Sequence, residues 1–145
     1  MSLAGMIDIP LRVFVDTSAY VALASKKDTY HTEALAIMKA LTDGHAALYT
    51  TNFVIAETHA TVLRYAGARV ARFYLQEITT SEAVDIIRAE AMDEQKAKDI
   101  IYRYADKDFS LVDAISFAVM ERLGISRVFA FDQHFAQYGF QTFQQ

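Results

Sequence analysis

The chain has 145 residues, enough for one hydrophobic core, and its 53% share of hydrophobic residues with a single proline excludes a disordered protein. It contains no cysteine, which excludes a disulfide framework, a thiolate zinc site and a thiol nucleophile. The net charge of -4 argues against a broad basic surface for nucleic acid, although acids gathered around bound cations can make a local site positive.

Strands and helices are expected to alternate in the first half of the chain. Hydrophobic spacing and turn residues predict a strand over 12–15, helices over 17–25 and 31–41, a strand over 47–50, and helices over 53–65 and 68–76. Asn52 is the expected N-cap of the helix over 53–65, and Gly67 is expected to end it.

The second half begins with an ambiguous stretch. Residues 81–91 combine β-branched side chains typical of a strand with Glu and Ala, which favour a helix. Helices are then expected over 93–105 and 110–123, the latter apolar on most sides and therefore buried. A strand over 128–131, a short helix over 133–137 and a last strand over 140–143 complete the prediction.

This alternation predicts an α/β fold with a parallel sheet and helices on both faces. We expect one domain over residues 1–145, with residues 1–10 flexible or partly added by cloning. In such sheets, ligands bind beyond the carboxyl ends of the strands, so acids at those ends are the first candidates for a functional site.

Four acids stand out by this criterion or by their apolar surroundings. Asp16 and Asp132 each follow a predicted strand, whereas Glu57 and Asp113 lie within helical stretches. Structural interpretations stay open for three of them: Asp16 and Asp132 suit helix N-caps, and Ser110 with Asp113 matches a capping box. Glu57 lies too far into its helix to act as a cap, and a lone acid there usually faces solvent.

If these acids converge, their charges repel and their pKa values rise unless cations fill the cluster. Mg²⁺ and Mn²⁺ prefer such oxygen ligands, and no His and Cys set for zinc is present. Carboxylate sites of this kind commonly hydrolyse phosphodiester bonds.

Four segments together carry a resemblance to a known family: "VDTSAY", "NFVIAET", "DKDFSLVDAISFAVMERLGI" and "VFAFDQHFAQYGF". In this order and spacing the chain resembles the PIN domain, in particular the small single-domain nucleases of the VapC toxin type. The resemblance extends over nearly the whole chain from about Val13. It implies a three-layer α/β/α sandwich with a central, mainly parallel sheet, and a strand over 84–88.

The resemblance also implies a metal-dependent ribonuclease that hydrolyses RNA. The family's acids correspond to Asp16, Glu57, Asp113 and Asp132, which would hold one or two Mg²⁺ or Mn²⁺ ions. In that assignment Glu57 binds metal or orients the attacking water. Four further residues are expected to support the site: Thr17, Ser18, Ser110 and His134. His134 would act either structurally or on a substrate phosphate.

Partners follow from the same resemblance. Small PIN proteins form homodimers, and the toxin-type members bind a small antitoxin that blocks the acidic site with a basic side chain. The basic group Arg64, Arg69 and Arg72 fits either RNA contact, a partner surface or a solvated helical face. A PIN nuclease of RNA processing and a non-catalytic PIN module that binds RNA or protein remain alternatives.

No apolar run approaches the roughly 20 residues of a membrane span, and the N-terminus lacks the pattern of a signal peptide. We therefore expect a cytoplasmic protein.

Overall fold

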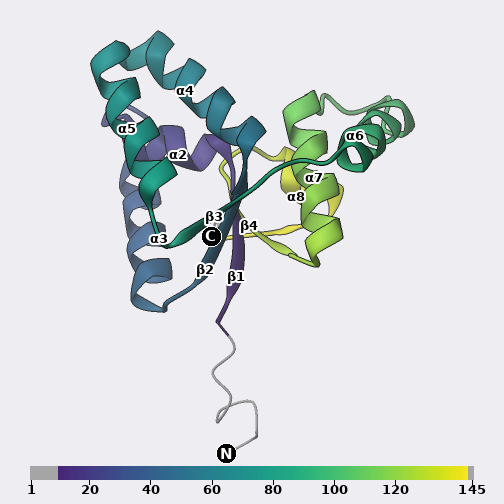
Figure 1. Ribbon diagram of the computed structural model, residues 1–145, viewed down its shortest axis with the longest axis horizontal. Helices are drawn as coiled ribbons and strands as arrows, with labels where there is room; N and C mark the ends of the chain where they lie inside the picture. Colours follow the sequence, from purple (N-terminus) through teal and green to yellow (C-terminus); the bar gives the residue numbers. More distant parts are fainter. Residues whose placement is uncertain (1–9, 144–145) are drawn as a thin grey trace, which may run out of the picture.

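The structure is a computed structural model that describes residues 10–143. The expectation for residues 1–10 therefore falls outside the described residues, apart from Pro10. Five parallel strands form one sheet in the order β3-β2-β1-β4-β5 (Figure 1). The strands are β1 (Arg12–Val15), β2 (Ala47–Thr51), β3 (Val84–Ile87), β4 (Arg127–Phe129) and β5 (Gln141–Thr142).

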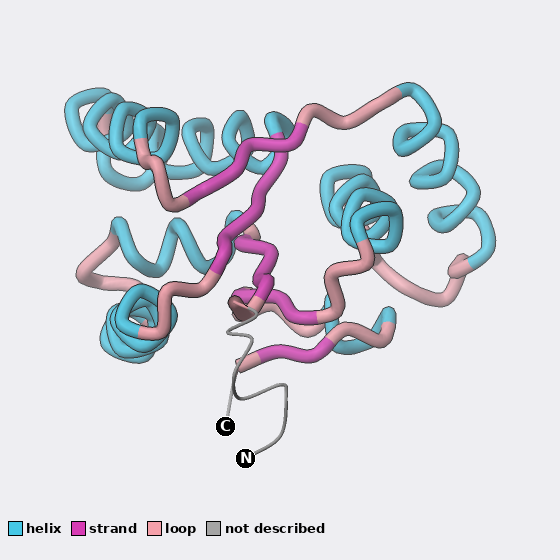
Figure 2. Tube along the Cα trace, turned by 60° about the horizontal axis from the view of Figure 1, so that its bottom comes forward, coloured by secondary structure: helices cyan, strands magenta, loops and turns pink. Residues whose placement is uncertain are grey.

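Helices cover both faces of this sheet. They are α2 (Thr17–Ala24), α3 (His31–Asp43), α4 (Asn52–Ala66), α5 (Ala68–Thr80), α6 (Ala91–Arg103), α7 (Leu111–Leu123) and α8 (His134–Tyr138). Helices α2 to α5 lie on one side of the sheet and α6 to α8 on the other (Figures 1 and 2). The predicted α/β/α sandwich is confirmed. No helix in residues 10–143 has the length and apolar character needed to cross a membrane.

The strand order creates a crevice at the middle of the sheet. From β1 the chain moves outward to β2 and β3, and it then returns to β4 on the opposite side of β1. The carboxyl ends of β1 and β4 are held together, with Val15 opposite Phe129 and the N–H of Asp16 donating to the Phe129 carbonyl over 3.0 Å. This is the point at which parallel α/β sheets usually bind their ligands.

Helix α7 forms the centre of the core on its side of the sheet. Its residues 113–120 are all buried, as expected from its apolar sequence. Phe117 packs edge-on against Phe109 and Phe135, with ring centroids 5.0 Å apart in both pairs. Because Phe135 lies in α8, these contacts hold the C-terminal segment against α7.

The start of α4 differs from the prediction. The N-cap is Thr51, not Asn52, because the Thr51 hydroxyl accepts the Val54 N–H over 3.1 Å. The Asn52 side chain instead accepts the Ala89 N–H over 3.0 Å and so ties α4 to the segment after β3. The prediction followed the higher cap preference of Asn and missed this long-range contact.

The structure settles the ambiguous stretch and corrects the bounds of one predicted strand. Residues 84–87 form β3, as the resemblance implied. The strand predicted over 128–131 ends at Phe129, because the next two residues turn toward α2, where the Phe131 N–H donates to the Ser18 hydroxyl over 2.9 Å. Asp132 therefore lies three residues beyond β4 rather than directly after it.

An ion pair between a buried carboxylate and a largely solvent-accessible arginine fastens α6 to α7. Asp93 is 3% exposed and accepts two hydrogen bonds from Arg122, at 3.0 Å from Nε and 2.9 Å from Nη2. Burial alone would raise the pKa of Asp93, but the hydrogen bonds and charge of Arg122 lower it below its ordinary value of 3.8. The pair thus stabilises the fold in its ionised form.

We predict that Arg122→Met lowers the free energy of unfolding by about 1–3 kcal/mol at pH 7, because it leaves a buried carboxylate without its charged partner. A folded-state pKa below 3.8 means that this contribution exists above that pH and disappears as pH falls through the lowered value. Urea unfolding at pH 7 and near pH 3 measures both effects. Lys98→Met, at an exposed position of α6, is the control; equal losses in the two variants would contradict the prediction.

Candidate metal centre

Asp16 is a buried carboxylate at the junction of β1 and α2. Its Oδ2 caps α2 by accepting the N–H of Ser18 over 3.1 Å and the Ser18 hydroxyl over 2.8 Å. Its Oδ1 is buried and has no hydrogen-bond partner among the described residues. Asp16 is therefore an N-cap, as one interpretation of the sequence held, and it also keeps one oxygen free for a ligand.

Asp113 occupies the third position of α7 in the predicted capping box. Its Oδ2 accepts the Ser110 N–H over 3.1 Å, while its own N–H donates to the Ser110 hydroxyl over 3.0 Å. The same Oδ2 lies 2.7 Å from Nδ1 of His134. An ionised carboxylate only accepts hydrogen bonds, so in that state the imidazole is the donor.

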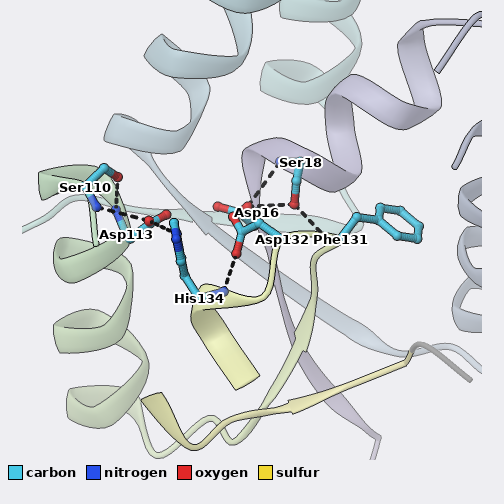
Figure 3. Close-up of polar contacts among 7 residues, drawn as sticks. All are labelled: Asp16, Ser18, Ser110, Asp113, Phe131, Asp132 and His134. Atoms are coloured by element: carbon cyan, nitrogen blue, oxygen red, sulfur yellow. Dashed lines mark hydrogen bonds and ion pairs between the residues drawn. The ribbon is translucent and has the colours of Figure 1, made fainter. Parts of the chain in front are cut away.

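Asp132 and His134 approach from the turn that leads into α8. Oδ1 of Asp132 accepts the backbone N–H of His134 over 2.9 Å. One candidate ligand atom from each of Asp113, Asp132 and His134 can be chosen so that all three lie within 4.8 Å of one another. Figure 3 shows Asp16 and Asp132 in the middle of this group, with Ser18 on one side and Asp113 and His134 on the other.

The carboxylates repel one another in a poorly solvated place. Burial raises the pKa of Asp16 from 3.8 to about 8, and the negative charge of Asp132 adds to this shift. Burial and the charge of Asp113 likewise raise the pKa of Asp132. Without a cation the cluster therefore holds extra protons at neutral pH, which is the expected behaviour of a ligand set built for positive charge.

Asp16 and Asp132 lie at the base of an open pocket of about 640 Å³. One wall is a single face of α4, since its lining residues 57, 60, 61 and 64 follow the helical period. The pocket is lined by Asp16, Thr17, Ser18, Val21, Asp28, Tyr30, Glu57, Ala60, Thr61, Arg64, Phe131 and Asp132.

Asp16 lies close enough to Asp132 and Asp113 for their charges to raise its pKa, whereas the structure leaves Glu57 apart on the α4 wall. Glu57 faces the same pocket as Asp16, yet it forms no hydrogen bond or ion pair with any described residue. Ser18 lies in the group through its bond to Asp16. The hydroxyl of Thr17 is directed elsewhere, toward the Val54 carbonyl at 3.5 Å.

Several pocket residues were not expected from the sequence. Asp28 and Tyr30 come from the loop before α3, and Phe131 comes from the turn after β4. No local sequence pattern predicts that these loop residues line the pocket, because only the fold brings them beside α4. The position of Arg64 could have been predicted from the sequence, because it lies seven residues after Glu57 and this spacing places both residues on one helical face.

This arrangement fits a hard divalent cation. The three converging carboxylates supply oxygen donors, one buried oxygen of Asp16 lacks a partner among the described residues, and a bound cation would offset the repulsion between Asp16 and Asp132. A single imidazole is too few nitrogen ligands for a structural zinc site. Fold and site together define a class: a parallel α/β domain with a carboxylate centre suited to a divalent metal at its topological switch point.

Comparison with known proteins gives the family. The PIN domain profile matches residues 13–141. The chain is 34% identical to the 23S rRNA-specific endonuclease VapC20 of Mycobacterium tuberculosis over 128 residues, covering 88% of this chain and 95% of that protein. It is 30% identical to a VapC ribonuclease of Archaeoglobus fulgidus over 128 residues, covering 87% and 80% of the two chains.

Solved structures agree with this assignment. The crystal structure of M. tuberculosis VapC20, described as a toxin that cleaves the sarcin–ricin loop, superposes with a TM-score of 0.80 and covers 89% of this chain and 96% of that one. A toxin–antitoxin complex from Klebsiella pneumoniae, at 15% identity and a TM-score of 0.58, shares the fold over 83% of this chain and 87% of that one. The chain belongs to the PIN-domain family, within its group of VapC-type ribonucleases.

The raised pKa values predict an unusual dependence of stability on pH in the metal-free protein. Asp16 releases its proton near pH 3.8 in the unfolded chain but near pH 8 in the folded one. Between these values the folded state binds more protons, so the free energy of unfolding falls as pH rises, by at most about 1.4 kcal/mol per pH unit for one proton. Asp16→Asn removes this proton and flattens the slope.

Urea unfolding in EDTA at several pH values between 4 and 8 measures this slope. Asp85→Asn, which changes an exposed carboxylate on β3, is the matched control and keeps the wild-type slope. If the free energy of unfolding of Asp16→Asn falls with pH as steeply as that of the wild type, the Asp16 carboxylate is not the cause of the pH dependence.

Proposed function

We propose that the protein is a metal-dependent endoribonuclease and the toxin of a toxin–antitoxin pair. The observation that carries the proposal is the carboxylate cluster at the switch point of the sheet. Asp113 and Asp132 offer, with His134, ligand atoms within 4.8 Å of one another, and Asp16 shares an open pocket with Asp132. The names of the VapC relatives support both the activity and the toxin role. They also make ribosomal RNA the first substrate to test.

In this proposal the cofactor is Mg²⁺ or Mn²⁺, held by Asp16, Asp113 and Asp132. The ion supplies Lewis acidity toward the scissile phosphate and lowers the pKa of a water that serves as the nucleophile. Asp16 binds through its unpartnered Oδ1, because its other oxygen is occupied by Ser18. Each of the three carboxylates is held by at least one backbone N–H, which fixes its direction before the ion arrives.

The remaining polar residues take supporting roles. Glu57, which faces the pocket from α4, orients the attacking water and accepts its proton. His134 holds Asp113 through its Nδ1 and fixes Asp132 through its backbone N–H. It is thus a positioning residue for two of the proposed ligands. Ser18 and Ser110 hold Asp16 and Asp113 in the same manner.

We predict that Asp16→Asn lowers the rate of RNA cleavage by at least about 10²-fold, because it removes a negative ligand from a preorganised centre. A gel assay with 23S rRNA fragments and Mg²⁺ measures the rate, and EDTA abolishes cleavage by the wild type. Asp85→Asn, with its exposed acid on β3, keeps full activity. Equal cleavage by Asp16→Asn and the wild type, or cleavage that persists in EDTA, would refute the assignment.

The proposed partners are a second copy of the chain and a small antitoxin. Large apolar side chains on α4 and α5 are exposed, among them Leu63, Tyr65 and Phe73, and such a surface suits a protein interface. An antitoxin would place a basic side chain against the acidic centre. This charge pairing mimics the cation that the carboxylates need.

We predict a homodimer at micromolar concentration by size-exclusion chromatography with light scattering, and a monomer there would contradict the prediction. Tyr65→Ser combined with Phe73→Ser is expected to shift the chain toward monomer, because it removes exposed apolar area. Growth arrest on expression distinguishes a toxin from an RNA-processing nuclease, and a short overlapping upstream gene, where the genome carries one, is the antitoxin to test for relief of the arrest.

A further inference from the structure

The rim of the acidic pocket carries an aromatic platform that the metal chemistry does not use. The rings of Tyr30 and Phe131 are stacked, with centroids 4.6 Å apart and planes 11° from parallel. Phe131 is the inner ring and is only 9% exposed, whereas Tyr30 is 42% exposed. Both line the pocket that contains Asp16 and Asp132.

This platform is held in a fixed position. The N–H of Tyr30 donates to the Asp28 carboxylate over 2.8 Å, and its carbonyl accepts the N–H of Ala34 at the start of α3 over 2.8 Å. The N–H of Phe131 donates to the Ser18 hydroxyl, which in turn donates to Asp16. A single hydroxyl thus connects the stacked pair to the acid at the metal centre.

The part of the pocket lining that α4 supplies carries a positive charge. Among the described residues that line the pocket, Arg64 is the only Lys or Arg, and it lies two helical turns beyond Glu57 on the same face of α4. The rise of an α-helix places these two residues about 10 Å apart along the helix axis. On the other side, the Asp28 carboxylate disfavours an anion beside Tyr30, which directs a phosphate toward Arg64.

We propose that Tyr30 and Arg64 form a binding subsite for the nucleotide next to the scissile phosphate of a single-stranded RNA. The base stacks on the exposed surface of Tyr30, and the neighbouring phosphate pairs with Arg64. The inference rests on the proposed function, because it assumes that the acidic centre receives a phosphodiester. The rim combines a flat, pre-ordered aromatic ring with a cation, and this combination is typical of sites for single-stranded nucleic acid.

The first test is binding of a short fluorescein-labelled single-stranded RNA, followed by fluorescence anisotropy in EDTA so that no cleavage occurs. Tyr30→Ala is expected to weaken binding between about 5-fold and 150-fold, the range of a lost base–aromatic stack. Tyr30→Phe keeps the ring and binds like the wild type. Tyr102→Ala, at an exposed tyrosine of α6 on the other side of the sheet, is the matched control and binds normally.

Two further readouts separate the proposed contacts from a purely structural role. Arg64→Ala reduces the slope of log affinity against log salt by about 0.7, the value for one lost phosphate contact to a single strand, whereas Tyr30→Ala leaves the slope unchanged. RNAs that lack one base at successive positions identify the stacked nucleotide. At one position, loss of the base is expected to weaken RNA binding to the wild type and to leave RNA binding to Tyr30→Ala unchanged.

Thermal unfolding verifies that the variants are folded. If Tyr30→Ala does not fold, Tyr30→Leu replaces it, because leucine keeps an apolar contact with Phe131. Unchanged RNA affinity in Tyr30→Leu and Arg64→Ala would overturn the subsite, while the proposed nuclease activity would stand. An RNA bound through Tyr30 by a protein that cleaves no RNA would instead refute the nuclease and keep the subsite.

Discussion

The constraint on which the site depends is the crowding of two mutually repelling carboxylates, the buried Asp16 and the half-buried Asp132, beside the junction of β1 and β4. The parallel strands bring the two segments together, and the backbone bond from Asp16 to Phe129 closes the junction. Burial there raises the pKa of Asp16 to about 8, so the fold maintains a place that is unfavourable for its own negative charges. The divalent cation of the proposed function would offset this repulsion.

The same residues that form the centre also begin the local structures around it. Asp16 caps α2, Asp113 completes the capping box of α7, and Asp132 accepts the N–H at the start of α8. These bonds offset part of the repulsion and fix the direction of each carboxylate without consuming every oxygen. The cap interpretation is confirmed for Asp16 and Asp113, and for Asp16 it leaves one oxygen free for the proposed metal-binding role.

The sequence predicted the elements that depend on local patterns. The bounds of β1, the burial of α7 and the capping box at Ser110 all follow from short-range spacing and were found as expected. Errors arose where distant contacts decide. The N-cap of α4 is Thr51 because Asn52 bonds to Ala89, and β4 ends early because Phe131 turns toward Ser18.

The site shows the same division. Asp16 and Asp132 were identifiable because carboxyl ends of parallel strands share one edge of the sheet. The position of Glu57 on a separate wall depends on the angle of α4, and the place of Tyr30 depends on the packing of a loop against Phe131. Neither has a local signature. The resemblance to the PIN family named the four acids, but only the structure separates the group of three from Glu57.

The central claim is that Asp16, Asp113 and Asp132 together bind a divalent cation. The most direct measurement is the anomalous scattering of Mn²⁺ in crystals of the protein. The account predicts a peak at the carboxyl ends of β1 and β4 with an oxygen of each of these three acids in its coordination shell. A peak elsewhere, or none at this junction when Mn²⁺ is in excess, would contradict it.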